Sequence, residues 1–111
     1  SERLMSNYAV RWTSAARADL EGIIGFIAED RLDAALHILE KLRKKALDLS
    51  NMPERGRLVP ELKAQGIIIY REIIHAPWRI IYKITDKTVY VLAVLDSRRN
   101  LEDILLDRFV D

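Results

Sequence analysis

The side chains of this sequence that could do chemistry are cations in its C-terminal half and a few groups that could move a proton. Arginine and lysine side chains can hold a phosphate or another anion, and a histidine or tyrosine side chain can give or take a proton. The candidates for holding a phosphate are Arg71, Arg79, Lys83, Arg98 and Arg99. The acid–base candidates are His75, which is also explained as a turn residue, and Tyr90, which is also explained as a packed strand residue.

Composition excludes several other kinds of site. The chain has 111 residues, no cysteine and two histidines, which excludes zinc ribbons, thiol nucleophiles and disulfides and makes a transition-metal cage unexpected. We therefore expect no metal and no cofactor. The net charge of +1 disfavours a stand-alone nucleic-acid binder. No apolar run approaches the roughly 20 residues of a membrane span and no leader is recognised, so we expect a cytoplasmic protein without membrane contact.

The hydrophobic period changes along the chain and predicts an α+β fold. We expect residues 1–4 to be a vector remnant or a disordered start, and residues 5–111 to form a single domain. The expected order is β-α-α-β-β-β-α, a helical hairpin packed on an antiparallel sheet with a short C-terminal helix. The strands are expected at residues 8–13, 67–74, 78–85 and 88–95, and the helices from about 14 to 29–31, at 33–50 and at 101–110.

The second expected helix carries a run of cations, Lys41, Arg43, Lys44 and Lys45. Such a run can be a nucleic-acid patch. More often it is the solvated side of an amphipathic helix. We favour the solvated side, because apolar residues recur at helical spacing elsewhere on the same helix.

The predicted strands also indicate which side chains share a face of the sheet. A three-residue loop at 75–77 and a two-residue loop at 86–87 would pair Ile73 with Arg79, and Ile81 with both Arg71 and Leu92. The face expected under the helices then holds Tyr70, Glu72, Ile74, Trp78, Ile80, Tyr82, Ile84, Val89, Val91, Ala93 and Leu95. The opposite face is half apolar and half cationic, and its cations have no expected acidic neighbour within the sheet. We expect the C-terminal helix or another chain to cover it.

Three segments of the chain resemble a known family. The sequence PERGRLVPE at residues 53–61 resembles the GR-V-PE loop of ParE-type toxins. YREI at 70–73 with WRIIYKI at 78–84 resembles the family's REI…YRIIYRI hairpin, and VLAVLDSRRNL at 91–101 is similar to its VLxVLHGRRDL ending. The strand–helix–helix opening fits as well. The chain thus resembles the RelE/ParE superfamily of bacterial type II toxin–antitoxin systems, in the ParE-like branch, which implies a RelE/ParE-like fold.

The resemblance implies a small toxin of the plasmid-stabilisation type, held inactive by a co-expressed antitoxin that wraps it. The half-apolar, cationic sheet face would suit an acidic, amphipathic and flexible segment. We therefore expect antitoxin contacts at Ile69, Ile73, Ile81, Lys83 and Leu92. Contact with DNA is expected only indirectly, through the antitoxin.

Two targets are implied by the superfamily. ParE-like members inhibit DNA gyrase and need no chemistry of their own, whereas RelE-like members cut mRNA on the ribosome. We favour gyrase inhibition, because the family's histidine is Asp96 here and its aspartate is Asn100, which leaves no firm acid–base pair. The expected target-binding residues are then Arg57, Arg98 and Arg99.

The alternative function is a ribosome-dependent mRNA endoribonuclease. Its phosphate-stabilising residues would be Arg71, Arg79 and Arg98, with His75 or Tyr90 as acid or base. A third possibility is a non-toxic binding module on the same fold, since close relatives on one scaffold differ in target.

Overall fold

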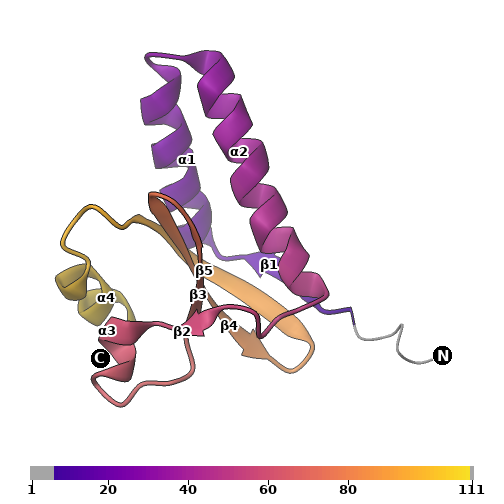
Figure 1. The fold of residues 1–111 in the computed structure, drawn as a ribbon, viewed down its shortest axis with the longest axis vertical. Coiled ribbons are helices and arrows are strands. Elements are labelled where there is room, and N and C mark those ends of the chain that lie inside the picture. The colour runs from indigo at the N-terminus through magenta and orange to yellow at the C-terminus, as the bar shows by residue number, and fades with distance from the viewer. Residues whose placement is uncertain (1–6, 111) are drawn as a thin grey trace.

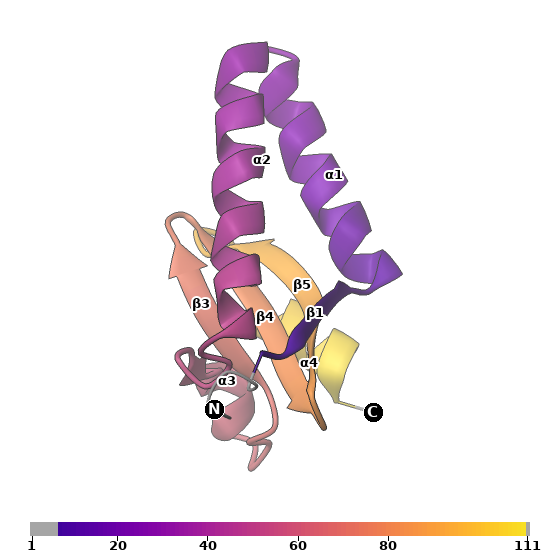
Figure 2. The same ribbon diagram turned by 90° about the vertical axis from the view of Figure 1, so that its right-hand side faces the viewer.

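Two long helices form a hairpin that stands on one face of a five-stranded sheet and projects beyond it (Figures 1 and 2). The computed structural model describes residues 7–110, so the prediction for residues 1–4 lies outside the described residues. The helices are α1 (Ser14–Ala28), α2 (Leu32–Leu47), α3 (Pro60–Lys63) and α4 (Glu102–Phe109), with a 3₁₀ turn η2 (Asp48–Ser50). The strands are β1 (Ala9–Trp12), β2 (Arg57–Leu58), β3 (Arg71–His75), β4 (Trp78–Thr85) and β5 (Thr88–Asp96). The predicted α+β architecture is confirmed.

The start of α1 is tied to the sheet by Thr13. Its hydroxyl accepts a hydrogen bond from the Ala16 backbone N–H at 3.2 Å, and donates one to the Val91 carbonyl oxygen of β5 at 3.1 Å. A threonine in this position satisfies a backbone donor that the first helical turn would otherwise leave unpaired. The same side chain therefore begins α1 and fixes where the helix leaves the sheet.

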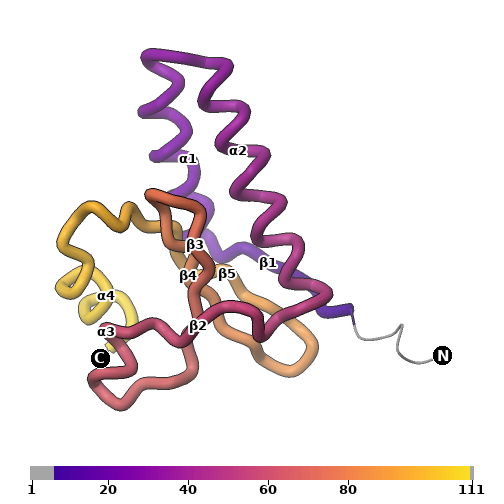
Figure 3. The backbone as a smooth tube through the Cα atoms, in the orientation of Figure 1, coloured from indigo at the N-terminus to yellow at the C-terminus, as the bar shows by residue number. Residues whose placement is uncertain are grey.

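The sheet is mixed rather than wholly antiparallel. Its strand order is β1-β5-β4-β3-β2, and β1 runs parallel to β5 while the other neighbours are antiparallel. The predicted connection from residue 51 to 66 contains β2 and α3, and Figure 3 shows it folding back beside α4. Residues 67–70 precede β3 instead of extending it, and Ile68 and Ile69 are exposed.

The register of β3 against β4 differs from the prediction by one residue. His75 pairs with Trp78, so the connecting loop has two residues in place of three. Ile73 consequently pairs with Ile80 rather than with Arg79. Because side chains alternate with a period of two, a slip of one residue moves every β3 side chain to the other face. The predicted faces are therefore wrong for Tyr70, Arg71, Glu72, Ile73 and Ile74.

A β-bulge in β5 causes a second departure. The loop at 86–87 has two residues, as predicted, and the pairing of β4 with β5 follows the predicted register up to Val91. Leu92 is then an extra residue, since Ile81 pairs with Ala93 in its place. Residues beyond the bulge change face, so the predicted faces are wrong for Ala93, Val94 and Leu95.

Two apolar cores result, one on each face of the sheet. The first lies under the α1–α2 hairpin and includes Trp78, Ile80 and Tyr82 from β4, on the face that the sequence predicts. The second lies under α3 and α4 and contains Val59, Leu62, Ile81, Ala93, Leu95, Leu101 and Leu105. The opposite sheet face is thus covered by this chain's own short helices, with α4 in the role predicted for it.

Tyr82 joins the first core to the segment after α2. Its side chain is fully buried, and its hydroxyl donates to the Pro53 carbonyl oxygen at 2.7 Å and accepts from the Gly56 N–H at 3.0 Å. Gly56 permits this approach, because a Cβ there would lie 2.5 Å from the Glu72 carbonyl oxygen. One strand tyrosine therefore anchors the start of the GRLVPE segment.

We predict that Tyr82→Ala destabilises the protein by about 3–5 kcal/mol, because it empties a core position and leaves two backbone groups without their partner. Tyr82→Phe keeps the ring and is expected to cost about 1–2 kcal/mol. Urea unfolding followed by circular dichroism measures both. A loss below about 1 kcal/mol for Tyr82→Ala would contradict the place of this residue in the core.

Candidate functional site

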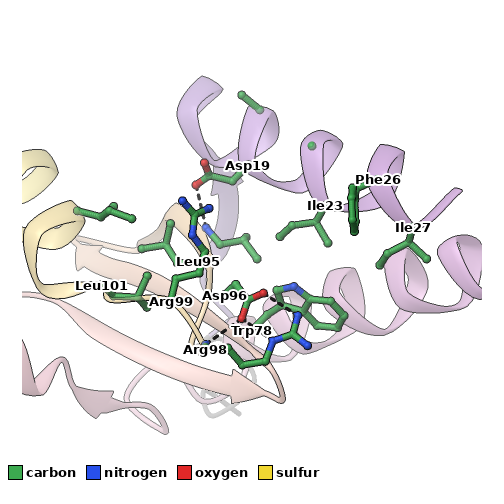
Figure 4. A pocket seen from close by; sticks show the side chains of 14 residues that line it. Asp19, Ile23, Phe26, Ile27, Trp78, Leu95, Asp96, Arg98, Arg99 and Leu101 are labelled. Atoms are coloured by element: carbon green, nitrogen blue, oxygen red, sulfur yellow. Dashed lines mark hydrogen bonds and ion pairs between the residues drawn. The ribbon is translucent and has the colours of Figure 1, made fainter. Parts of the chain in front are cut away.

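A groove lies between α1 and the end of β5 (Figure 4). It has a volume of about 480 Å³. Its walls are largely apolar, with Ile23, Phe26 and Ile27 on the α1 side and Trp78 and Leu101 opposite them. Arg98 and Arg99, from the loop between β5 and α4, complete it. The site therefore combines an apolar floor with two cations, and the carboxylates of Asp19 and Asp96 line it as well.

The groove exists because β1 is shorter than β5. The β1–β5 pairing ends at Trp12 and Val91, where the chain turns into α1. Beyond this point β5 has no strand on its β1 side among the described residues, and its backbone groups need other partners. Asp19 of α1 accepts the Val94 N–H at 3.0 Å. The helix thus stands beside the bare strand edge and leaves a trough along it.

An ion pair caps this strand edge. Arg108 of α4 lies 3.0 Å from the Asp19 carboxylate and also donates to the Leu92 carbonyl oxygen at 3.0 Å. Asp19 thus accepts from the Val94 N–H and Arg108 donates to the Leu92 carbonyl oxygen, so the pair bonds the backbone next to the bulge and connects α1, β5 and α4. Sequence reasoning did not single out either residue, since they are 89 positions apart and only the fold brings them together.

Arg98 is restrained by its neighbour Asp96. The Asp96 carboxylate accepts from the Arg98 Nη2 at 2.7 Å, from its Nε at 3.0 Å and from its backbone N–H at 2.9 Å. These contacts lower the pKa of Asp96 to about 2, so the pair stays ionised throughout the physiological range. The guanidinium is nevertheless 71% exposed and is presented at the rim of the groove.

Arg79 has a structural position instead of a surface one. Its guanidinium is buried between two carboxylates, with Glu61 at 2.7 and 2.8 Å and Glu72 at 2.6 Å. The Glu61 bond is the main reason why the pKa of Arg79 is raised, and it lowers the pKa of Glu61 in turn. The prediction that the sheet cations lack acidic neighbours is therefore wrong. The register slip of β3 carries Glu72 to the face of Arg79.

The remaining ribonuclease candidates lie apart from one another. Arg71 donates to the Gly56 carbonyl oxygen at 2.7 Å on the helix side of the sheet. His75 ends β3 near α2, with its ring stacked on Trp78 at a centroid distance of 6.4 Å. Tyr90 lies in the β1–β5 ladder opposite Arg11. Of the five candidates, only Arg98 lines the groove.

The target-binding set is only partly brought together. Arg98 and Arg99 share the groove, whereas Arg57 lies on β2 at the far edge of the sheet and is held by Glu72 at 2.6 Å. The glutamate that binds Arg57 is the one that binds Arg79. The GRLVPE segment and both strands of the family-like hairpin therefore meet in one ion network.

The five predicted antitoxin contacts do not share a face. Ile73 is buried in the first core and Ile81 in the second, so the structure contradicts a common surface that includes them. Ile69 is exposed before β3, while Lys83 and Leu92 are half-buried. The helical hairpin also exposes large apolar side chains, and Phe26 among them is 77% exposed beside the groove. Gly22 lines the same groove and adds no side chain to this flank of α1.

Among residues 7–110, no group of three or more histidine or acidic side chains could hold a metal ion. No described helix is long and apolar enough to cross a membrane. What the groove can do chemically is bind: it offers an apolar surface with two cations at one end.

Comparison with known proteins gives the family. A sequence profile described as the ParE toxin of the type II toxin–antitoxin system parDE matches residues 10–101. The chain belongs to this toxin family. The match includes α1, the GRLVPE segment and the arginines of the groove, so the ParE-family sequence and the site coincide. No individual curated protein matches the sequence.

Solved structures support the same fold. A chain of the chromosomal ParDE toxin–antitoxin system from P. aeruginosa superposes with a TM-score of 0.68 at 17% identity, over 82% of this chain and 97% of that one. A chain of the RelBE2 toxin–antitoxin complex from Mycobacterium tuberculosis superposes with a TM-score of 0.63 at 27% identity, over 83% and 93%. The RelE/ParE-like architecture predicted from the sequence is confirmed.

We predict that Arg79→Ala lowers the free energy of unfolding by about 3–5 kcal/mol, because it leaves two carboxylates near the core without their cation. Arg98→Ala is the matched control, since it also removes an arginine from an ion pair, but an exposed one, and should leave the free energy of unfolding nearly unchanged. Chemical denaturation of the two variants measures the difference. Equal losses would show that the Arg79 network is not a structural anchor.

The Glu61–Arg79 contact also predicts a pH dependence. Arg79 holds the pKa of Glu61 below its usual 4.5, so the folded state favours the carboxylate. Its contribution is present above pH 4.5 and is lost as the pH falls through the lowered pKa. Denaturation between pH 7 and 2 is expected to show Glu61→Gln less stable than the wild type at pH 7, with the two curves converging on acidification. A constant gap between the curves would contradict this account.

Proposed function

We propose that this ParE-family chain acts by inhibiting DNA gyrase, and that it docks on its target with the end that carries Arg98 and Arg99. The observation that carries the proposal is the groove itself. It combines exposed cations with an apolar wall, which is the composition of a protein-binding surface with arginine anchors. Inhibition by docking needs no acid or base.

The dispersion of the ribonuclease candidates supports the same choice. RNA cleavage needs a base, an acid and a phosphate cradle within reach of one phosphorus atom. Of the cations considered for that cradle, Arg79 is buried between Glu61 and Glu72, and Arg71 is engaged by the Gly56 carbonyl oxygen. His75 and Tyr90 lie on different elements, and neither lines the groove.

An antitoxin is the second partner in the proposal. Both solved neighbours carry titles that describe toxin–antitoxin systems or complexes. The groove suits a segment with apolar side chains for the α1 wall and carboxylates for Arg98 and Arg99. A segment that filled the groove would cover both arginines. Neutralisation then follows from competition for one surface.

The arginines are tested by Arg98→Ala combined with Arg99→Ala in a gyrase supercoiling reaction. The wild type is expected to block supercoiling, and the double variant to need at least about tenfold more protein, because arginine anchors often contribute more than 1 kcal/mol each. The thermal midpoint is expected to stay within a few degrees, since both side chains are exposed.

The matched control is Arg11→Ala combined with Arg17→Ala, which removes the same charge from exposed positions that do not line the groove. This variant should inhibit like the wild type. Unimpaired inhibition by the Arg98 and Arg99 variant would contradict the docking proposal. Normal supercoiling with codon-phased cuts in ribosome-bound mRNA would favour the RelE-like ribonuclease, and no effect in either reaction would favour a non-toxic binding module.

A further inference from the structure

A second charged hollow lies away from the groove, between the end of α2 and the end of β3. It is about 300 Å³ in volume and is lined by Lys41, Lys44, Lys45, Asp48, Arg55 and His75. It shares no lining residue with the groove. Three separate parts of the chain contribute to it, namely the helix α2 with its 3₁₀ turn, the loop after that turn, and β3.

The cations of this hollow are mostly uncompensated. Asp48 is its single carboxylate and is paired with Lys44 at 3.3 Å. Lys41, Lys45 and Arg55 form no ion pair with another described residue. Isolated cations held together repel one another, so an anionic ligand at this place would relieve a cost that the folded chain bears.

Two further acidic residues lie near these cations but form no ion pair with them. Glu40 lines a different hollow on α2, together with His37 and Arg43. Glu54 lines a neighbouring hollow with Tyr8, and Arg55 contributes to both hollows. Four cations with one carboxylate therefore meet in a chain whose net charge is only +1. The near-neutral total conceals a local concentration of positive charge.

The arrangement fits a phosphate backbone better than a small anion. Lys41 and Lys45 are one helical turn apart, about 6 Å along α2. A DNA strand carries one charge per about 3.4 Å of helix axis, so the two side chains can reach different phosphates. The hollow is lined by long, flexible side chains, which neutralise phosphates without reading bases.

A duplex is favoured over a single strand. Single-stranded nucleic acids are held by aromatic rings on which bases stack. The only ring in the hollow, that of His75, is already stacked on Trp78 with an interplanar angle of 8°, and Trp78 is buried. We propose that this hollow binds the backbone of duplex DNA, independently of sequence.

This contact is direct, in contrast to the expectation that the chain meets DNA only through its antitoxin. It also changes the interpretation of the cation run in α2. Arg43 lies elsewhere, so the run as a whole is not one patch. Lys41, Lys44 and Lys45 join Arg55 from another segment, and the sequence of the helix alone does not show this convergence.

Fluorescence anisotropy of the full chain with a labelled DNA duplex of about 20 base pairs tests the proposal. Three phosphate contacts predict a slope of about −2.7 for log K against log salt, and therefore about 40-fold weaker binding at 200 mM than at 50 mM salt. Lys41→Gln, Lys45→Gln and Arg55→Gln combined should remove most of that slope. Circular dichroism shows whether the triple variant is folded, and single substitutions that each reduce the slope by about 0.9 test the proposal if it is not.

The matched control is Arg11→Gln, Arg17→Gln and Lys63→Gln, which removes three exposed cations outside the hollow. It should keep the wild-type slope within about one unit. If both triple variants lost the same amount of slope, net charge alone would explain the binding and the proposal would be overturned. A wild-type slope of log K against log salt shallower than −1 would overturn it as well. Tighter binding to single-stranded or duplex RNA would overturn the assignment to DNA. The assay contains no gyrase, so its result is independent of the proposed target.

Discussion

The buried guanidinium of Arg79 is the interaction on which the C-terminal half of the molecule depends. A charge in this position is tolerated only with partners of opposite charge. Glu72 comes from the adjacent strand and Glu61 from α3, so the contact holds β4, β3 and α3 in one arrangement. With α3 fixed, Leu62 joins Leu105 of α4 in the second core. The family-like residues of the GRLVPE segment are therefore structural anchors in this chain.

The groove follows from the same arrangement. The loop with Arg98 and Arg99 runs from β5 to α4, and both ends of that loop are held. Arg108 of α4 meets Asp19 of α1 over the bulge in β5, which blunts a strand edge that would otherwise attract another strand. The pairing of Arg79 with its two glutamates and the Arg108–Asp19 pair thus hold the groove in place. Arg98 and Arg99 are exposed and are therefore available for binding, whereas Arg79 and Arg108 hold the fold together.

Local patterns in the sequence predict the elements well and the pairing less well. The helices α1, α2 and α4 and the strands β4 and β5 follow from periods of 3.6 and 2, because each signal is contained in neighbouring residues. The predicted face of each β3 side chain is wrong because of one residue: His75 pairs with Trp78 in the sheet and does not belong to the turn. The bulge at Leu92 depends on the side chains of Asp19 and Arg108, which no local pattern connects to β5.

The candidate site shows the same division. Arg98 and Arg99 are recognisable from their place after a strand, and the structure keeps them exposed at the groove. Arg79 has the same chemistry in the sequence, yet its burial between two glutamates removes it from any surface. The prediction of one antitoxin-binding face is wrong for the same reason as the β3 register. Ile73 and Ile81 lie on opposite faces of the sheet, in two different cores. The apolar wall of α1 becomes visible only once the helix is seen to stand beside the short end of β1.

The central claim is that one groove serves both partners, gyrase as the target and the antitoxin as the inhibitor. Hydrogen–deuterium exchange of the full chain, alone and with each partner, tests this most directly. The account predicts that both partners slow exchange at residues 94–101 and on the flank of α1 from residue 18 to 27. The claim would be contradicted if the antitoxin slowed exchange in these two segments but gyrase slowed it only in other segments or not at all.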